Sequence, residues 1–147
     1  MAEPTGHFLR VEIVAPDGPV FEGDVAMVVV PAMRGELGIL PRHAPLVAQL
    51  TVGEIRVQAL DGSWMVLAVA EGFVKVQFDT VIILADAAEL ATEIDVPRAE
   101  AALERATQRL EALKQGGVSD DGEEVDVYRE SMALKRAKNR LRVVHRD

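Results

Sequence analysis

The stretch Gly35–Leu46, which reads GELGILPRHAPL, holds side chains that are able to do acid/base chemistry. Glu36 and His43 are a carboxylate and an imidazole, a usual pair for proton transfer. No nucleophile, cofactor motif or oxyanion site is recognisable around them. The glycines permit tight turns, the prolines fix φ, and the apolar side chains anchor the segment to a core. The sequence therefore favours a stiff loop that displays Glu36, Arg42 and His43 to a partner. A small β-sandwich enzyme using Glu36 and His43 is the alternative.

Other catalytic motifs are missing from the sequence. No glycine precedes any lysine, so there is no Walker phosphate loop, and no two glycines have the spacing of a dinucleotide fingerprint. The chain has no cysteine, and its 3 histidines lie in different segments. We therefore expect no catalytic residue and no metal ligand.

Up to about residue 86, apolar side chains alternate with polar ones or form short solid runs, and both patterns are typical of strands. The alternating segments are Phe8–Val14, Gly53–Leu60 and Phe73–Phe78; the solid runs, expected to be buried on both faces, are Ala26–Val30, Trp64–Ala70 and Val81–Ala85. Turn residues separate these segments at Pro16–Pro19, Asp61–Gly62 and Glu71–Gly72. Many short strands with no helix between them favour an antiparallel sandwich or barrel.

After Glu93 the apolar period changes to 3.6, which indicates amphipathic helices. Asp95 is expected to cap the first helix and Gly116–Gly117 to end it. A second helix is expected from about Val125, after a short acidic connector at 118–124. Two helices so closely joined should form an antiparallel hairpin. The predicted stripes are Ala99, Ala102, Leu103, Ala106, Leu110 and Leu113, and Ala133, Leu134, Ala137, Leu141 and Val144. Alanine-rich seams bury little area, at ~25 cal/mol per Å², so the hairpin is expected to open readily.

Charge is unevenly distributed along the chain. Residues 1–94 carry 5 basic and 13 acidic side chains, whereas residues 95–147 carry 11 of each. The segment Ser131–Arg146 holds six basic side chains and no acid. A basic end on an acidic body predicts an acidic partner, such as protein carboxylates, a nucleotide or nucleic acid. A nucleic-acid-binding β-sandwich module that uses this helix is therefore an alternative, although the 4% aromatic content argues against it.

No segment has the pattern of a secretion signal or transit peptide. The longest apolar run, Val25–Met33, contains Pro31 and is too short to span a bilayer. Any membrane association is therefore expected to be indirect.

Four motifs in order carry a family resemblance. They are GELGILPRHAPL, VGEIRV (Val52–Val57), VAEGFVKV (Val69–Val76) and VIILADAAE (Val81–Glu89). Together they closely resemble the epsilon subunit of bacterial F-type ATP synthases, over nearly the whole chain. The resemblance implies a mainly β plus α fold: an N-terminal antiparallel β-sandwich of about ten strands at 1–90, then an antiparallel two-helix hairpin at 91–147. It also implies a non-catalytic central-stalk subunit at the cytoplasmic face of the bacterial membrane, which meets the membrane only through the complex.

The resemblance further implies which surfaces meet partners. The sandwich would dock on the gamma subunit and the c-ring, and no nucleic acid is implied. The implied contact residues are Glu36, Leu40, Pro41, Arg42 and His43. The basic helix would extend to the alpha/beta catalytic head and hinder ATP hydrolysis. Its implied inhibitory residues are Lys135, Arg136, Lys138, Arg140 and Arg142.

ATP is implied as a regulatory ligand, with no cofactor required. Ile94–Ala99 fits the I/L-D-x-x-R-A pattern that some family members use to bind ATP. The implied binding residues are Glu89, Asp95, Arg98, Ala99, Arg136 and Arg140. Arg136 and Arg140 are i,i+4 neighbours on one helix face, and arginine hydrogen-bonds phosphate well. The alternative is structural: Asp95 caps the helix and pairs with Arg98, and Pro97 offers no N–H to a ligand.

Overall fold

A computed structural model describes residues 7–116 and 126–145 of this chain. The chain divides after Ala91 into two compact units. The first unit contains seven strands among its described residues: β1 (Leu9–Ala15), β2 (Gly18–Ala32), β3 (Gly35–Ile39), β4 (Leu46–Leu50), β5 (Gly53–Ala59), β6 (Trp64–Gln77) and β7 (Thr80–Leu90). A single 3₁₀ turn at Ala91–Glu93 spans the boundary, and the second unit contains α1 (Val96–Lys114) and α2 (Val127–Val144).

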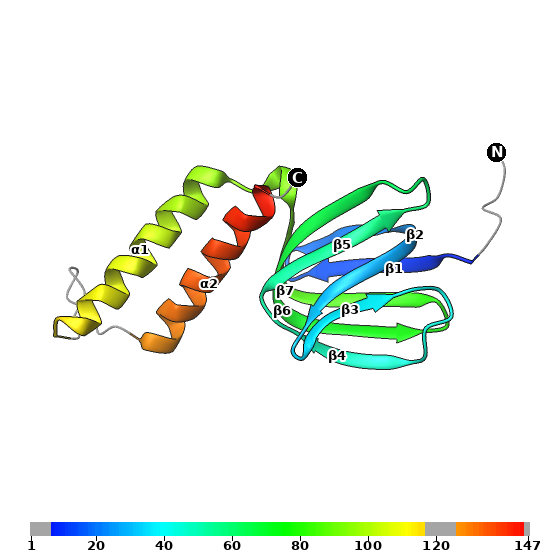
Figure 1. The fold of residues 1–147 in the computed structure, drawn as a ribbon, viewed down its shortest axis with the longest axis horizontal. Coiled ribbons are helices and arrows are strands. Elements are labelled where there is room, and N and C mark those ends of the chain that lie inside the picture. Colours follow the sequence, from blue (N-terminus) through cyan, green and yellow to red (C-terminus); the bar gives the residue numbers. More distant parts are fainter. Residues whose placement is uncertain (1–6, 117–125, 146–147) are drawn as a thin grey trace. The chain divides into compact units, whose positions relative to one another are not determined.

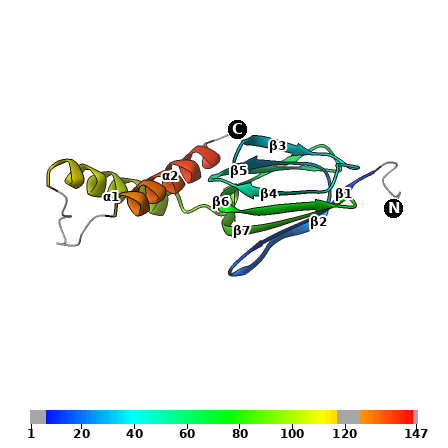
Figure 2. The ribbon, with the colours of Figure 1, turned by 90° about the horizontal axis from the view of Figure 1, so that it is seen from below.

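The strands form the two layers of a sandwich (Figures 1 and 2). β1 lies between β2 and β7, antiparallel to the first and parallel to the second. The long strands serve both layers: β2 pairs first with β1 and then with β3 and β5, while β6 pairs first with β5 and then with β4. The predicted sandwich and helices are confirmed. The estimate of about ten strands is too high for the described residues, because a long strand that serves both layers counts once.

The core of the sandwich is aliphatic, as the low aromatic content requires. Its largest fully buried side chains include Leu9, Ile13, Ile39, Leu50, Ile55, Leu67 and Ile83. The expectation of burial on both faces holds for Val28, Val29 and Val30. It is wrong for the runs containing Trp64 and Leu84, which are 50% and 56% exposed, because each of these strands has an outward face.

Glu71–Gly72 is a bend inside β6, not the turn that the sequence predicts. Both residues have positive φ, at 56° and 135°. The bend falls where β6 changes partner, from β5 before Ala70 to β4 after it. Gly72 also passes close to β7: a Cβ at this position would lie 2.1 Å from the carbonyl oxygen of Leu84. The chain can take this path because glycine has no side chain.

The hairpin between β6 and β7 turns at Phe78 and Asp79, because Gln77 pairs with Thr80. Both turn residues have positive φ, at 50° and 59°. Two-residue hairpin loops favour this geometry but usually supply it with Asn-Gly or Asp-Gly. Phe78 is also 86% exposed, so little packing offsets its backbone strain.

We therefore predict that Phe78→Asn stabilises the sandwich by about 1 kcal/mol, since left-handed backbone costs most L-residues roughly 1–2 kcal/mol. Urea unfolding of the two proteins measures the difference. A loss of stability in the variant would mean that the phenyl ring packs usefully on its neighbours.

The helices of the second unit lie side by side (Figure 1). Asp95 caps α1 as predicted, and Asp126 caps α2, which begins two residues after the expected Val125. Gly116, at φ 142°, follows the end of α1, while Gly117 and the acidic connector lie outside the described residues. In the second stripe the buried valine is Val143, not the predicted Val144. An ion pair of 2.9 Å joins Arg109 near the end of α1 to Glu130 near the start of α2, as an antiparallel hairpin requires.

Candidate functional site

The GELGILPRHAPL segment is half strand and half loop. Its first five residues form β3, so Glu36 lies on a strand and not in the predicted loop. Gly38 is also part of β3 and makes no turn. The sequence predicts that Leu40 anchors the loop to the core. This prediction is wrong, because Leu40 is 55% exposed. The pleat of β3 explains this, because Ile39 faces the core and the next side chain must point outward.

Glu36 belongs to a small charged cluster on the sandwich, the β3–β5 cluster of Glu36, Arg56 and Glu54. Arg56 Nη2 lies 2.9 Å from Glu36 Oε2, and Arg56 Nε lies 3.5 Å from Glu54 Oε1. Arg56 and Glu36 reside on β5 and β3, which both pair with β2. The guanidinium therefore reaches across a whole strand to meet Glu36. The alternation of VGEIRV places Glu54 and Arg56 on one face, a signal the sequence did contain.

Arg42 belongs to a different cluster, which ties the loop after β3 to the β6–β7 turn. Its backbone, at φ 69°, donates an N–H to Asp79 Oδ1 at 2.6 Å, and its guanidinium contacts His7. The carbonyl of Asp79 in turn accepts the N–H of Arg10 at 2.8 Å. Asp79 thus fastens three segments that lie far apart in sequence, and sequence reasoning missed it for that reason.

Glu36 and His43 do not form an acid/base pair. Glu36 binds Arg56, whereas the His43 ring contacts the carbonyl of Ala44 at 2.7 Å. A cavity of about 440 Å³ beside β3 and β4 includes Glu36 in its wall but not His43. The alternative of an enzyme built on this pair therefore has no geometric support.

The outward face of β4, β6 and β7 carries an apolar patch, the outer patch of Val47, Phe73 and Leu84. These side chains are 68%, 54% and 56% exposed. Phe73 pairs directly with Leu84 across β6 and β7, and Val47 lies opposite the next outward residue of β6, Lys75. Clustered apolar side chains of this size on a surface mark interaction sites more often than single exposed ones do.

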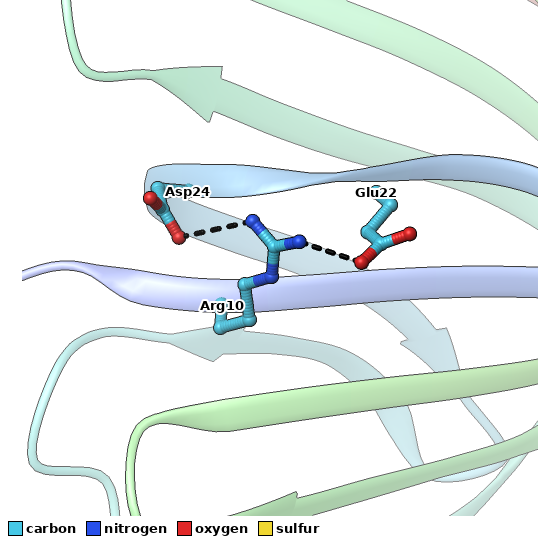
Figure 3. Close-up of polar contacts among 3 residues, drawn as sticks. All are labelled: Arg10, Glu22 and Asp24. Atoms are coloured by element: carbon cyan, nitrogen blue, oxygen red, sulfur yellow. Dashed lines mark hydrogen bonds and ion pairs between the residues drawn. The ribbon is translucent and has the colours of Figure 1, made fainter.

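On the neighbouring pair of strands, Arg10 lies between two carboxylates (Figure 3). Its guanidinium nitrogens are 2.6 Å from Glu22 and 3.4 Å from Asp24. The hydrogen bond to Glu22 is the main cause that raises the pKa of Arg10 above its ordinary value. All three side chains are exposed, so the cluster adds little stability to the pairing of β1 and β2 and does not form a site.

In the helical unit, Asp95 accepts the backbone N–H of Arg98 at 3.1 Å, which is the capping role. The Arg109–Glu130 ion pair shows which residues of α1 and α2 lie at the same height along the helix axes. Arg98 precedes Arg109 by eleven residues, and Leu141 follows Glu130 by eleven, so Arg98 and Leu141 lie at similar heights. Arg136 and Arg140 are therefore within about 8 Å of Arg98 along the helix axes, at 1.5 Å per residue.

The remaining predicted residues lie on α1, β7 and α2. Ala99 is buried at the first turn of α1, and Glu89 lies on β7 of the sandwich unit. On α2, Lys135, Lys138 and Arg142 are exposed, whereas Arg136 and Arg140 are half-buried. The basic helix thus has one solvated cationic face and a second pair of arginines on a more sheltered one.

The described residues offer neither a metal centre nor a membrane-spanning helix. No group of three or more His, Cys, Asp or Glu side chains among residues 7–116 and 126–145 has the arrangement of a metal site. Within that same part of the chain, neither helix is long and apolar enough to cross a bilayer.

Taken together, these features define a β-sandwich with contact surfaces, joined to a two-helix unit. A family profile described as the ATP synthase delta/epsilon chain beta-sandwich domain matches residues 8–91, and that of its long alpha-helix domain matches residues 92–145. The chain belongs to the ATP synthase delta/epsilon chain family.

Bacterial relatives agree with this assignment, and a solved structure shares the fold. The ATP synthase epsilon chain of Alkalihalophilus pseudofirmus is 56% identical over 110 residues, 75% of this chain and 82% of the relative. That of Bacillus subtilis is 53% identical over 102 residues, 69% and 76% of the two chains. A chain of the Euglena gracilis mitochondrial ATP synthase has the same fold, with a TM-score of 0.75 at 21% identity, covering 96% of this chain and 86% of the other.

Proposed function

We propose that this protein is a non-catalytic central-stalk subunit of a bacterial F-type ATP synthase, held at the cytoplasmic face of the cell membrane by the complex. The proposal rests on one observation: the chain is 56% identical in sequence to bacterial ATP synthase epsilon chains over about three quarters of its length. In this role the sandwich docks on the gamma subunit and the c-ring, and the helices regulate the alpha/beta catalytic head.

The surfaces of the sandwich support docking on two partners. The outer patch offers apolar area, whose burial is the dominant favourable term in most protein–protein association. The loop with Leu40, Pro41, Arg42 and His43 offers a fixed mixture of apolar and cationic groups, because Asp79 holds it in place. We assign the outer patch to the gamma subunit and this loop to the c-ring side.

The docking role predicts distinct losses in a binding assay with a purified gamma–c-ring subcomplex. Phe73→Ser, which removes an exposed ring, should weaken binding at least about tenfold, since hot-spot aromatic side chains contribute about 2 kcal/mol or more. Lys75→Ser, on the same strand and face, is the matched control and should change affinity little. Failure of the wild-type protein to bind would overturn the docking role itself.

We further infer that the helical unit inhibits ATP hydrolysis by opening. Opening breaks the Arg109–Glu130 pair and lets the cationic face of Lys135, Lys138 and Arg142 reach carboxylates of the catalytic head. The buried apolar side chains of the two described helices are Ala99, Ala106, Ala137 and Val143, a small seam, so few contacts oppose this motion. Deletion of residues 92–147 should therefore raise the ATPase activity of the reconstituted enzyme while leaving assembly intact. Unchanged activity would remove the inhibitory role.

ATP is the ligand we propose for the closed hairpin. Arg98, Arg136 and Arg140 fall within about 8 Å along the helix axes by residue count, and three guanidinium groups at that spacing would suit a triphosphate. ATP at 100 times its dissociation constant would stabilise the closed form by about 2.7 kcal/mol. That energy changes the ratio of closed to open forms roughly a hundredfold.

A calorimetric titration tests this site with two variants. Arg98→Ala/Arg136→Ala should lose most of the heat of ATP binding, whereas Lys135→Ala/Lys138→Ala, on the solvated face of the same helix, should keep it. Identical titrations for the wild-type protein and the first variant would exclude the site.

A further inference from the structure

The β3–β5 cluster of Glu36, Arg56 and Glu54 is more enclosed than an ordinary surface ion pair. The Arg56 side chain is 25% exposed and Glu54 is 11% exposed, whereas Glu36 is 61% exposed. The guanidinium is thus half enclosed, with one carboxylate sheltered beneath it and the other presented to solvent. An exposed pair between freely moving side chains would contribute little by itself.

Arg56 has a fixed position because its strand is central. β5 pairs with β2 on one side and with β6 on the other, so its backbone has no free edge within the described sandwich. Arg56 crosses β2 to bind Oε2 of Glu36, on a strand that pairs with β2 alone. Glu36 Oε1 has no partner among the residues that the structure describes. One oxygen is therefore fixed and the other remains available for a hydrogen-bond donor.

This arrangement lowers the cost of burying Glu36 in an interface. A lone carboxylate loses its hydration when a partner covers it, and an unpaired charge is then strongly unfavourable. A carboxylate already paired with a guanidinium keeps its compensation in the complex. The cluster holds two carboxyl groups and one guanidinium, a composition that suits a basic or N–H donor on the partner.

We propose that Arg56 is a positioning residue for docking: it orients Glu36 and compensates its charge so that Glu36 can accept a hydrogen bond from a basic side chain of the rotor. Glu54 supports Arg56 through the ion pair of 3.5 Å to Nε. The inference rests on the proposed central-stalk role, and it assigns the interaction to Arg56 acting through Glu36, not to either residue alone.

A double-mutant cycle measures the coupling. The dissociation constant for the gamma–c-ring subcomplex is determined for wild type, Glu36→Gln, Arg56→Gln and the double variant, with urea unfolding of each free subunit. We expect Arg56→Gln to weaken binding at least about tenfold. The double variant should bind no more weakly than Arg56→Gln alone, because the neutral amide that replaces the Glu36 carboxylate needs no compensation.

The control is Gln58→Ala, two residues along the same face of β5, which should bind like wild type. Arg56→Lys provides a second variant if the Arg56→Gln protein does not fold, since an ammonium keeps the charge but cannot bridge both carboxylates. Losses that simply add, or an equal loss for Gln58→Ala, would overturn the role of Arg56. Absence of wild-type binding would instead overturn the central-stalk role, so the two failures are distinguishable.

Discussion

Replacing Gly72 by alanine is expected to destabilise the sandwich by about 4 kcal/mol or more, a large part of the roughly 5–15 kcal/mol that typically separates folded and unfolded states. Two independent causes act at this position. The backbone has φ 135°, a conformation that costs L-residues about 1–3 kcal/mol. In addition, the new Cβ would lie 2.1 Å from the Leu84 oxygen and 2.8 Å from Ala85 Cα. Both contacts are with backbone, which no change of side-chain rotamer can relieve.

Gly18 supplies the matched control for this prediction. Its φ is 126°, close to that of Gly72, but a Cβ there would meet nothing within 4 Å. Gly18→Ala therefore carries the conformational cost alone. Urea unfolding should show Gly72→Ala less stable than Gly18→Ala by at least about 2 kcal/mol. Equal losses at the two sites would mean that β7 moves aside freely and that the bend does not hold the layers together.

The second large effect is expected in the helical unit, from Arg109→Met. The Glu130 side chain is 9% exposed and is bound by Arg109 at 2.9 Å. Removing one partner of a buried ion pair typically costs about 3–5 kcal/mol, because the remaining charge loses its compensation. The Arg109 side chain is 30% exposed, so we expect a loss near the lower end of this range. In a hairpin with a small alanine seam, a loss of this size should open the two helices.

Hydrogen exchange of the α1 and α2 amides measures the opening of the helices separately from any change in the sandwich. Arg109→Met should accelerate exchange in both helices, and Arg109→Met/Glu130→Leu should restore much of the protection. Lys114→Met is the control, because its ion pair with Glu111 joins two exposed side chains of one helix. Unaltered exchange in Arg109→Met would show that the pair adds nothing to the hairpin. If the proposed regulation holds, the same variant should also inhibit ATP hydrolysis more strongly.

The sequence by itself determined the cap of the first helix and the class of most elements, with β3 as an exception because its residues were predicted to lie in a loop. Period-two alternation selects strands and period 3.6 selects helices, because side chains must face one core from a pleated or a coiled backbone. Asp95 needs only a backbone N–H three residues away, so its capping role is a local property. The four ordered motifs were also specific enough to identify the family from the order of residues alone.

Only the tertiary structure decided which charged groups meet. Within one short motif, Glu36 forms an ion pair with Arg56, whereas the Arg42 N–H donates to Asp79. The tertiary structure also turns Glu71–Gly72 from an apparent turn into a bend, because β6 must cross between layers without ending. Such contacts join residues that are 20 and 37 positions apart along the chain. Local periodicity carries no information at that range, since strand order and register set the distances between side chains on different strands.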